Sequence, residues 1–267
     1  MGLEIGGRVM TSTEALEIDF VPKSAIVLGG GVIGCEFASM WRSFGVDVTV
    51  IEGLPHLVAN EDPAIIKTLE REFKKRGIKS NLGTFFEKVE QDDNGAKVTL
   101  ADGKEFEAEI VLVAVGRGPN TADMGLEEAG VAMTESGHIR VDTVSRTTAP
   151  GIYAAGDCTG VMPLASVAAM QGRIAVAHIL GDTVHPLRTD EVASNIFTSP
   201  EIASVGITQQ DVEADPAMFT GMTMNLATNP RAKMMAVDDG FVKIFARRGS
   251  GTVMGGVVVG CLLYTSD

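Results

Sequence analysis

A glycine-rich segment that follows a short apolar run constrains the fold of this chain most strongly. Residues 29–34 read GGGVIG, the apolar run covers residues 24–28, and a helical pattern over residues 32–44 follows. The next predicted strand, residues 47–51, ends at an acidic residue, Glu52. Strand, glycine turn, helix, strand and terminal acid in this order are typical of a βαβ motif that binds a dinucleotide.

The glycines and the acidic residue have separate expected roles in such a motif. Gly29 permits the tight turn, Gly31 lets a pyrophosphate approach the backbone, and Gly34 lets the helix pack closely on the strand. The pyrophosphate then lies on the N-terminus of the helix, where unpaired N–H groups attract negative charge. Glu52 is expected to accept hydrogen bonds from ribose hydroxyls and to repel a 2′-phosphate, so the sequence predicts NAD rather than NADP. Chance placement of an acid after a glycine-rich turn is the weaker alternative.

The next part of the chain continues an α/β pattern. Asp62 and Pro63 are typical of a helix start, and an apolar stripe follows them up to Gly77, before a short strand. Residues 85–109 alternate around turn residues, which indicates an antiparallel meander, and the apolar run 110–115 indicates a central strand. We therefore predict the fold class α/β, with a Rossmann-like sheet that carries an antiparallel β-meander insert.

Two further turns follow predicted strands. Gly116 follows the central strand, where a ligand crevice is expected, although this segment could be only a loop. Asp157 ends a predicted strand over residues 151–155 and precedes a predicted helix over residues 164–180. Its carboxylate can accept a hydrogen bond from a polyol hydroxyl, or it can serve as an ordinary turn residue. The pattern then changes to short strands, among them residues 241–246 and 253–260.

Composition and charge exclude several classes of protein. The formal net charge of −13 is opposite to that of a nucleic-acid-binding surface. We expect no membrane span, since no apolar segment reaches about 18 residues. We also expect no signal peptide, since the first residues lack a basic and then apolar stretch. The three cysteines are far apart in sequence, which favours a reducing, cytoplasmic setting. The histidines show no metal-ligand spacing, so no metal site is predicted.

Together these motifs resemble the pyridine nucleotide-disulfide oxidoreductase family. The matching stretches are AIVLGGGVIGCEFA at 25–38, VGRGPN at 115–120, GIYAAGD at 151–157, LASVAAMQGR at 164–173 and FTSPEIASVG at 197–206. They occur in the order that the family shows, and together they are far more specific than the glycine-rich segment alone. The resemblance extends from about residue 9 to residue 260.

The resemblance implies two cofactors, NAD and FAD. The NAD site would comprise Gly29, Gly31, Gly34 and Glu52 at the pyrophosphate and ribose, with Val32, Glu36 and Gly116 at the nicotinamide. The FAD site would comprise Asp157 at the ribityl chain and the backbone of Leu164, Ala165 and Ser166 at the pyrimidine end of the flavin. The dipole of the helix that starts there would stabilise negative charge on the reduced flavin.

The resemblance also implies a domain organisation. An N-terminal segment (residues 1–20) would precede the NAD-binding domain (21–120), the C-terminal part of an FAD-binding domain (121–187) and the start of an α+β dimer-interface domain (188–260). Residues 261–267 do not continue the family pattern and form an unplaced tail. The full-length parent is therefore expected to be a homodimer.

Three features of the family are missing from this sequence. These are the FAD-binding GxGxxG motif, the CxxxxC redox disulfide and the His-Glu acid/base pair. Cys35 and Cys158 are not placed as a redox pair, and inert packing is the favoured interpretation for both. The chain is therefore expected to be truncated at both ends, to hold no catalytic residue, and to be inactive by itself.

Three functions remain open at this point. The family default is hydride transfer between NAD(H) and flavin in an enzyme of the dihydrolipoyl dehydrogenase type, with a small-molecule or lipoyl electron partner. Residues 165–173, 229–234 and 255–259 are more similar to an actinobacterial branch that lacks the disulfide and reduces quinones with NAD(P)H. The third possibility, of another class, is an NAD-binding fragment without turnover.

Overall fold

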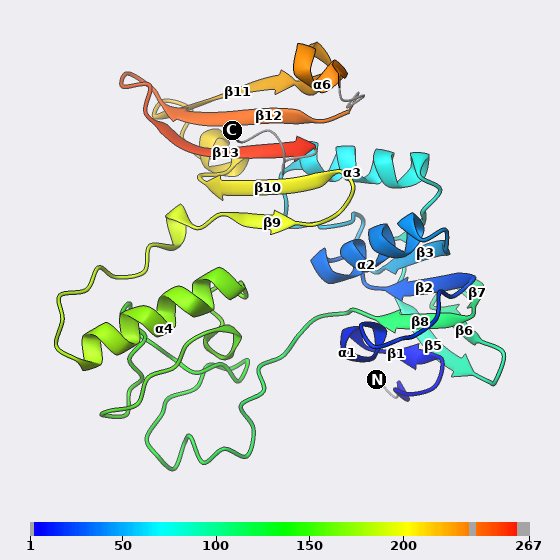
Figure 1. Cartoon of the computed structure of the whole chain (residues 1–267), viewed down its shortest axis with the longest axis horizontal. Coiled ribbons are helices and arrows are strands. Elements are labelled where there is room, and N and C mark those ends of the chain that lie inside the picture. The colour runs from blue at the N-terminus through cyan, green and yellow to red at the C-terminus, as the bar shows by residue number, and fades with distance from the viewer. Residues whose placement is uncertain (1–2, 235–238, 261–267) are drawn as a thin grey trace. The chain divides into compact units, whose positions relative to one another are not determined.

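The computed structural model describes residues 3–234 and 239–260. The chain divides into two compact units: unit 1 comprises Met1–Gly116 and Asn195–Asp267, and unit 2 comprises Arg117–Ser194 (Figure 1). Unit 1 holds the predicted βαβ motif, whereas unit 2 holds one long helix and many turns. Within the described ranges, no helix combines the length and the apolar character needed to cross a membrane.

A parallel sheet with the strand order β1-β8-β2-β3-β4 confirms the predicted α/β class. Its strands are β1 (Val9–Met10), β2 (Ser24–Leu28), β3 (Asp47–Glu52), β4 (Lys79–Leu82) and β8 (Ile110–Val113). The sequence does not predict β1, because a strand of two residues shows no periodicity. It forms because Val9 and Met10 find partners in β8, opposite Val111 and Leu112.

Different elements cover the two faces of this sheet. Helices α2 (Val32–Ser43) and α3 (Pro63–Lys75) pack on one face, and the predicted antiparallel meander packs on the other (Figure 1). The meander consists of β5 (Phe86–Gln91), β6 (Ala96–Leu100) and β7 (Glu105–Ala108). In β2, Val27 belongs to the core on the helix side and Ile26 to the core on the meander side. Because successive side chains of a strand point to opposite faces, a strand covered on both faces must be apolar throughout.

The start of α3 follows its sequence signal. Asp62 is the N-cap: its Oδ1 accepts a hydrogen bond from the Ala64 N–H at 2.7 Å, and Pro63 is the first helical residue. The apolar stripe of this helix is buried at Ile65, Ile66, Leu69 and Phe73. A shorter helix, α1 (Ser12–Ala15), precedes β2 in the chain.

A second, antiparallel sheet has the strand order β11-β12-β13-β10-β9. Its strands are β9 (Ser194–Ile196), β10 (Glu201–Gly206), β11 (Phe219–Asn225), β12 (Phe241–Arg247) and β13 (Val253–Gly260). The predicted strands 241–246 and 253–260 are confirmed. Helices α5 (Gln209–Ala214) and α6 (Pro230–Met234) connect its strands. Phe245 and Val259 belong to the same buried cluster as Phe73 of α3, so the two sheets of unit 1 share one core.

Unit 2 is built around α4 (Ala165–Ile179), which matches the predicted helix over residues 164–180. Short 3-10 turns lie at Asp157–Thr159 and Thr189–Glu191. A small apolar cluster centred on Val131, Ile139 and Ala149 forms the core of this unit.

The strand predicted over residues 151–155 is wrong. Tyr153 forms only an isolated bridge, with Arg146. A turn closed by the Ile152 N–H on the Ala149 carbonyl precedes it, and Gly156 then takes φ +89°. These two turns leave too few residues between them for a ladder, so the segment pairs at one point and bends away.

Candidate nucleotide site

The turn between β2 and α2 has the geometry that the motif predicts. Gly29 has φ +106°, in the left-handed region that favours glycine. A methyl group on Gly29 would collide with the carbonyl of Ala114, just after β8, and one on Gly34 would collide with the carbonyl of Gly29. A methyl group on Gly34 would also lie 3.1 Å from Val27 Cγ1. Gly34 therefore lets α2 approach both the turn and β2.

Gly31 differs from these two glycines. A methyl group at this position would meet no atom within 4 Å, and its φ of −73° suits any residue. Packing within the described part of the chain therefore does not explain a glycine here. An open, exposed backbone at this point fits the close approach of a ligand such as a pyrophosphate.

The helix that starts at this turn has no side-chain cap. Gly31 is the N-cap of α2 and Leu164 is the N-cap of α4, and neither helix has a side-chain hydrogen bond at its start. In contrast, Thr11, Asp62 and Thr208 cap α1, α3 and α5 with their side chains. The first N–H groups of a helix have no intrahelical partners and attract anions. The starts of α2 and α4 thus leave these donors without a side-chain cap, at the two helices where the sequence predicts cofactors.

Glu52 lies at the end of β3 and is hydrogen-bonded to the glycine turn. Its Oε2 accepts from the Gly30 N–H at 2.6 Å, and its Oε1 accepts from the Leu54 N–H at 2.7 Å. A carboxylate oxygen can accept more than one hydrogen bond, so a ribose diol can still bind this half-buried group. The structure therefore brings Glu52 together with the predicted phosphate-binding turn.

The segment after Glu52 supports the same turn, and the sequence gives no role to it. Leu57 is fully buried, and a methyl group on Gly30 would lie 2.6 Å from Leu57 Cδ2. The Val58 N–H donates to the Gly30 carbonyl at 2.8 Å. The only sequence signal is a pair of apolar residues, Leu57 and Val58, inside a segment that otherwise resembles a polar loop.

The residues predicted to border the nicotinamide lie around the same turn. Val32 is the first residue of α2 and is 41% exposed. Glu36, one turn later, accepts a hydrogen bond from the Phe197 N–H at 2.8 Å, which connects α2 to the segment before β10. Gly116 follows β8 with φ +135° and an open space where a side chain would stand.

Cys35 lies beneath the turn and is not a reactive thiol. Its side chain is buried and donates to the Gly30 carbonyl at 3.3 Å. Burial, together with the nearby carboxylates Glu52, Glu36 and Glu70, raises the pKa of this thiol to about 12. It therefore stays protonated at neutral pH, in agreement with its predicted packing role.

In unit 2, Asp157 is exposed and starts a 3-10 turn. This turn is held against α4 by Gln171, which is only 2% exposed. The Gln171 Oε1 accepts from the Gly156 N–H at 2.7 Å, and its Nε2 donates to Thr159 Oγ1 at 3.3 Å. Gln171 has no role predicted from the sequence. The available signal is a polar residue on a helix face whose other members, Val167 and Ile174, are buried.

The three residues predicted at the pyrimidine end of the flavin form the start of α4. Leu164 is half-buried, and Ala165 and Ser166 are exposed. They belong to unit 2 together with Asp157, whereas the predicted NAD residues belong to unit 1. Each group therefore forms a local arrangement of its own.

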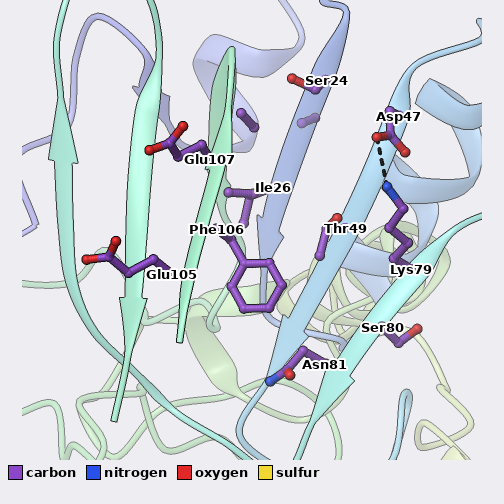
Figure 2. A pocket seen from close by; sticks show the side chains of 12 residues that line it. Ser24, Ile26, Asp47, Thr49, Lys79, Ser80, Asn81, Glu105, Phe106 and Glu107 are labelled. Carbon is purple, nitrogen blue, oxygen red and sulfur yellow. Dashed lines mark hydrogen bonds and ion pairs between the residues drawn. The ribbon is translucent and has the colours of Figure 1, made fainter. Parts of the chain in front are cut away.

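A cavity of about 410 Å³ lies elsewhere, between strands β2, β3 and β4 of the parallel sheet and β7 of the meander (Figure 2). Phe106, Asn81 and an ion pair between Lys79 and Asp47 (2.9 Å) line it. It contains residues from the start of β2, whereas the glycine turn follows the end of β2. It includes none of the predicted site residues. Among the described residues, no group of three or more His, Cys, Asp or Glu side chains is placed to hold a metal ion.

Two family models match the chain. The model described as pyridine nucleotide-disulphide oxidoreductase matches residues 2–172. The model for the dimerisation domain of the same family matches residues 192–262.

Individual relatives carry two different names. An NAD(P)H dehydrogenase (quinone) from Mycobacterium tuberculosis is 44% identical over 95% of this chain and 52% of its own length. A dihydrolipoyl dehydrogenase from Chlamydia pneumoniae is 38% identical over 97% of this chain and 56% of its own length. The chain thus spans about half the length of the curated relatives it matches.

Two solved structures are similar to this chain in both fold and sequence. The crystal structure of LpdA from Mycobacterium tuberculosis matches with a TM-score of 0.89 and 44% identity, over 94% of this chain and 55% of that chain. The HOCl-induced flavoprotein disulfide reductase RclA from Escherichia coli matches with a TM-score of 0.87 and 29% identity, over 95% and 58%. With a family model that matches most of its length and a fold shared with these proteins, the chain belongs to the pyridine nucleotide-disulphide oxidoreductase family.

Proposed function

We propose that this chain carries the NAD site of a flavoprotein that transfers hydride between NAD(H) and flavin. The observation that supports it most is the glycine turn, in which Gly31 is open, α2 is uncapped and Glu52 is hydrogen-bonded to Gly30. The proposed domains are the NAD-binding domain (21–120), the C-terminal part of the FAD-binding domain (121–187) and the start of the dimer-interface domain (188–260). Residues 1–20 precede them, and residues 261–267 lie outside the described residues.

In this proposal the chain binds and orients the nucleotide. The N–H groups at the start of α2 bind the pyrophosphate beside Gly29, Gly31 and Gly34, and Glu52 accepts from the adenosine ribose. Val32, Glu36 and Gly116 border the nicotinamide. A bound flavin would supply the hydride acceptor or donor.

The same proposal gives unit 2 the task of holding the flavin. Asp157 accepts from the ribityl hydroxyls, and the uncapped backbone at Leu164, Ala165 and Ser166 faces the pyrimidine end. Gln171 keeps the Asp157 turn in place on α4. Support comes from the absence of a side-chain cap on α4, which leaves its first N–H groups available.

The second substrate has two candidates. A lipoyl group is supported by the relatives named dihydrolipoyl dehydrogenase, and a quinone by the relative named NAD(P)H dehydrogenase (quinone), which has the higher identity of the two compared above. We favour the quinone because of that identity. The parent protein is proposed to be a cytoplasmic homodimer. The match to the dimerisation domain supports the dimer, and the wide spacing of the cysteines supports a reducing compartment.

Glu52→Ala tests the NAD site. Loss of a hydrogen bond to a charged group costs about 1.5–3 kcal/mol, so the Kd for NADH should rise roughly tenfold to a hundredfold. The Kd for NADPH should change less, since the variant also removes the repulsion of the 2′-phosphate. Titration of the 267-residue chain by nucleotide fluorescence measures both constants. Glu87→Ala removes the same charge from an exposed position of β5 and should leave both constants unchanged. An unaltered NADH/NADPH preference in Glu52→Ala would contradict the assignment.

Flavin absorbance tests whether this chain by itself holds FAD or only binds NAD. We expect the chain as it stands to bind NADH and to purify without stoichiometric FAD, since the family's FAD-binding GxGxxG motif is not in this sequence. The absorbance of the purified protein near 450 nm (roughly the flavin band) measures the FAD content. One FAD per chain would rule out the fragment that only binds NAD. It would also show that unit 2 holds flavin without that motif.

A further inference from the structure

The loop between β3 and α3 (residues 53–58) is held at both ends by carboxylates. At its start, Glu52 accepts from the Leu54 N–H at 2.7 Å. At its end, Glu70 of α3 accepts from the Leu57 N–H at 3.1 Å, and the same oxygen lies 3.2 Å from His56 Nδ1. The sequence predicts a role for Glu52 but not for Glu70, because the contact of Glu70 joins a helix to a loop and leaves no local pattern.

Glu70 acts on the glycine turn through this loop. Leu57, whose N–H it holds, is fully buried against Gly30, and the next residue, Val58, donates to the Gly30 carbonyl at 2.8 Å. On the other side of Gly30, the carboxylate of Glu52 accepts a hydrogen bond from the Gly30 N–H. Gly30 is thus held on one side by Glu52 and on the other by the 53–58 loop, which Glu70 anchors.

The charges around this loop are unequal. His56 is the only basic residue between Gly53 and Glu61 in the sequence, and Glu70 is paired with it. The side chain of Glu70 is 27% exposed, so its charge is only partly screened by solvent. Glu70 also contributes, with Glu52 and Glu36, to the electrostatic field at Cys35 directly beneath the turn. The carboxylates of Glu52 and Glu70 therefore both contact the loop at the end of β3, together with one histidine.

We propose that Glu70 is a second determinant of nucleotide specificity, which positions the 53–58 loop on the glycine turn and disfavours a 2′-phosphate. This inference rests on the proposed function, since it concerns the same nucleotide site. Its carboxylate repels a dianionic phosphate at the ribose and keeps His56 from serving as a phosphate ligand. The relatives do not determine this preference, because one of them is named for NAD(P)H without distinction.

Glu70→Gln separates the charge of Glu70 from its hydrogen bonding. A glutamine oxygen can still accept from the Leu57 N–H, so the Kd for NADH should stay within about twofold. Loss of the negative charge should lower the Kd for NADPH by about threefold to tenfold at low ionic strength, and added salt should reduce this gain. The gain should be smaller in the double variant Glu70→Gln/His56→Gln, which keeps the loss of repulsion but removes the imidazole. Glu70→Ala, which also removes the acceptor, should weaken NADH binding, and Glu70→Gln should restore it.

Glu72→Gln is the matched control. It makes the same change two residues later on α3, where the carboxylate pairs with Arg71 and Lys75 instead of the loop, and should leave both nucleotide constants unchanged. A wild-type chain that binds neither nucleotide would overturn the proposed function and this inference together. A wild-type chain that binds NADH, with an unchanged NADPH/NADH ratio in Glu70→Gln, would overturn this inference alone. Equal weakening of both nucleotides in Glu70→Gln would reduce Glu70 to a structural residue and would also overturn it.

Discussion

Replacing Gly34 with alanine should destabilise the nucleotide-binding sheet by at least about 3 kcal/mol, at the upper end of the range for overpacked positions. The added methyl group would overlap the carbonyl of Gly29 and lie 3.1 Å from Val27 Cγ1. Backbone cannot move aside as a flexible side chain can, so α2 would have to shift away from β2. Urea denaturation followed by tryptophan fluorescence reports this directly, because the chain has one tryptophan, Trp41, which is buried in α2.

Gly31→Ala provides the comparison. Its methyl group meets no atom within 4 Å, so the free energy of unfolding should stay within about 0.5 kcal/mol of wild type. NADH binding should nevertheless weaken by at least about tenfold, since the methyl group would separate the pyrophosphate from the backbone. A Gly31→Ala chain that binds NADH like wild type would contradict the assignment of the pyrophosphate site to this turn. A stable Gly34→Ala chain would contradict the packing argument.

Replacing Lys243 with methionine should cost about 3–5 kcal/mol, the range for breaking one partner of a buried ion pair. Lys243 lies in β12 and its Nζ is 2.6 Å from Asp62 Oδ2, with side-chain exposures of only 9% and 4%. Gln209 Oε1 accepts a further hydrogen bond at 3.3 Å. The variant would leave the Asp62 carboxylate buried without its cation, at the N-cap of α3.

The double variant Lys243→Met/Asp62→Asn isolates the charge. Asparagine is also a good N-cap, so the Ala64 N–H keeps an acceptor while the unpaired charge is removed. Most of the lost stability should return. The exposed pair between Lys79 and Asp47 is the control: Lys79→Met should cost less than about 1 kcal/mol. Equal losses in Lys243→Met and Lys79→Met would show that the buried pair is not a stability determinant.

Sequence patterns predict those elements of this fold that depend on residues close together in the chain. The apolar run at 24–28 and the turn at 29–34 are adjacent in sequence, so strand, turn and helix could be predicted together. The cap at Asp62 is likewise a local signal. The strand Val9–Met10 is not predicted because it depends on a distant partner, β8. The prediction of a strand over 151–155 is wrong for a local reason: turns at both ends leave room for a single bridge.

The candidate site shows the same division. Gly29, Gly31, Gly34 and Glu52 could be chosen from spacing alone, whereas Leu57, Glu70 and Gln171 act through contacts that spacing does not encode. One signal was available and unused. Lys243 alternates with Phe241 and Phe245 in β12, so period-two alternation places a lysine on an apolar face. A charged residue in that position predicts a buried partner, and the structure supplies Asp62.

The four contacts to Gly30 affect how a nucleotide would bind as well as where. Glu52, at the end of β3, accepts from the Gly30 N–H, and Cys35 of α2 donates to the Gly30 carbonyl. Val58 donates to the same carbonyl, and Leu57 packs beside Gly30. The turn is therefore preorganised, and little conformational entropy remains to be lost when a ligand arrives. Association with this turn should be limited by diffusion and electrostatic repulsion from an acidic protein, and differences in affinity among variants should appear mainly in the dissociation rate.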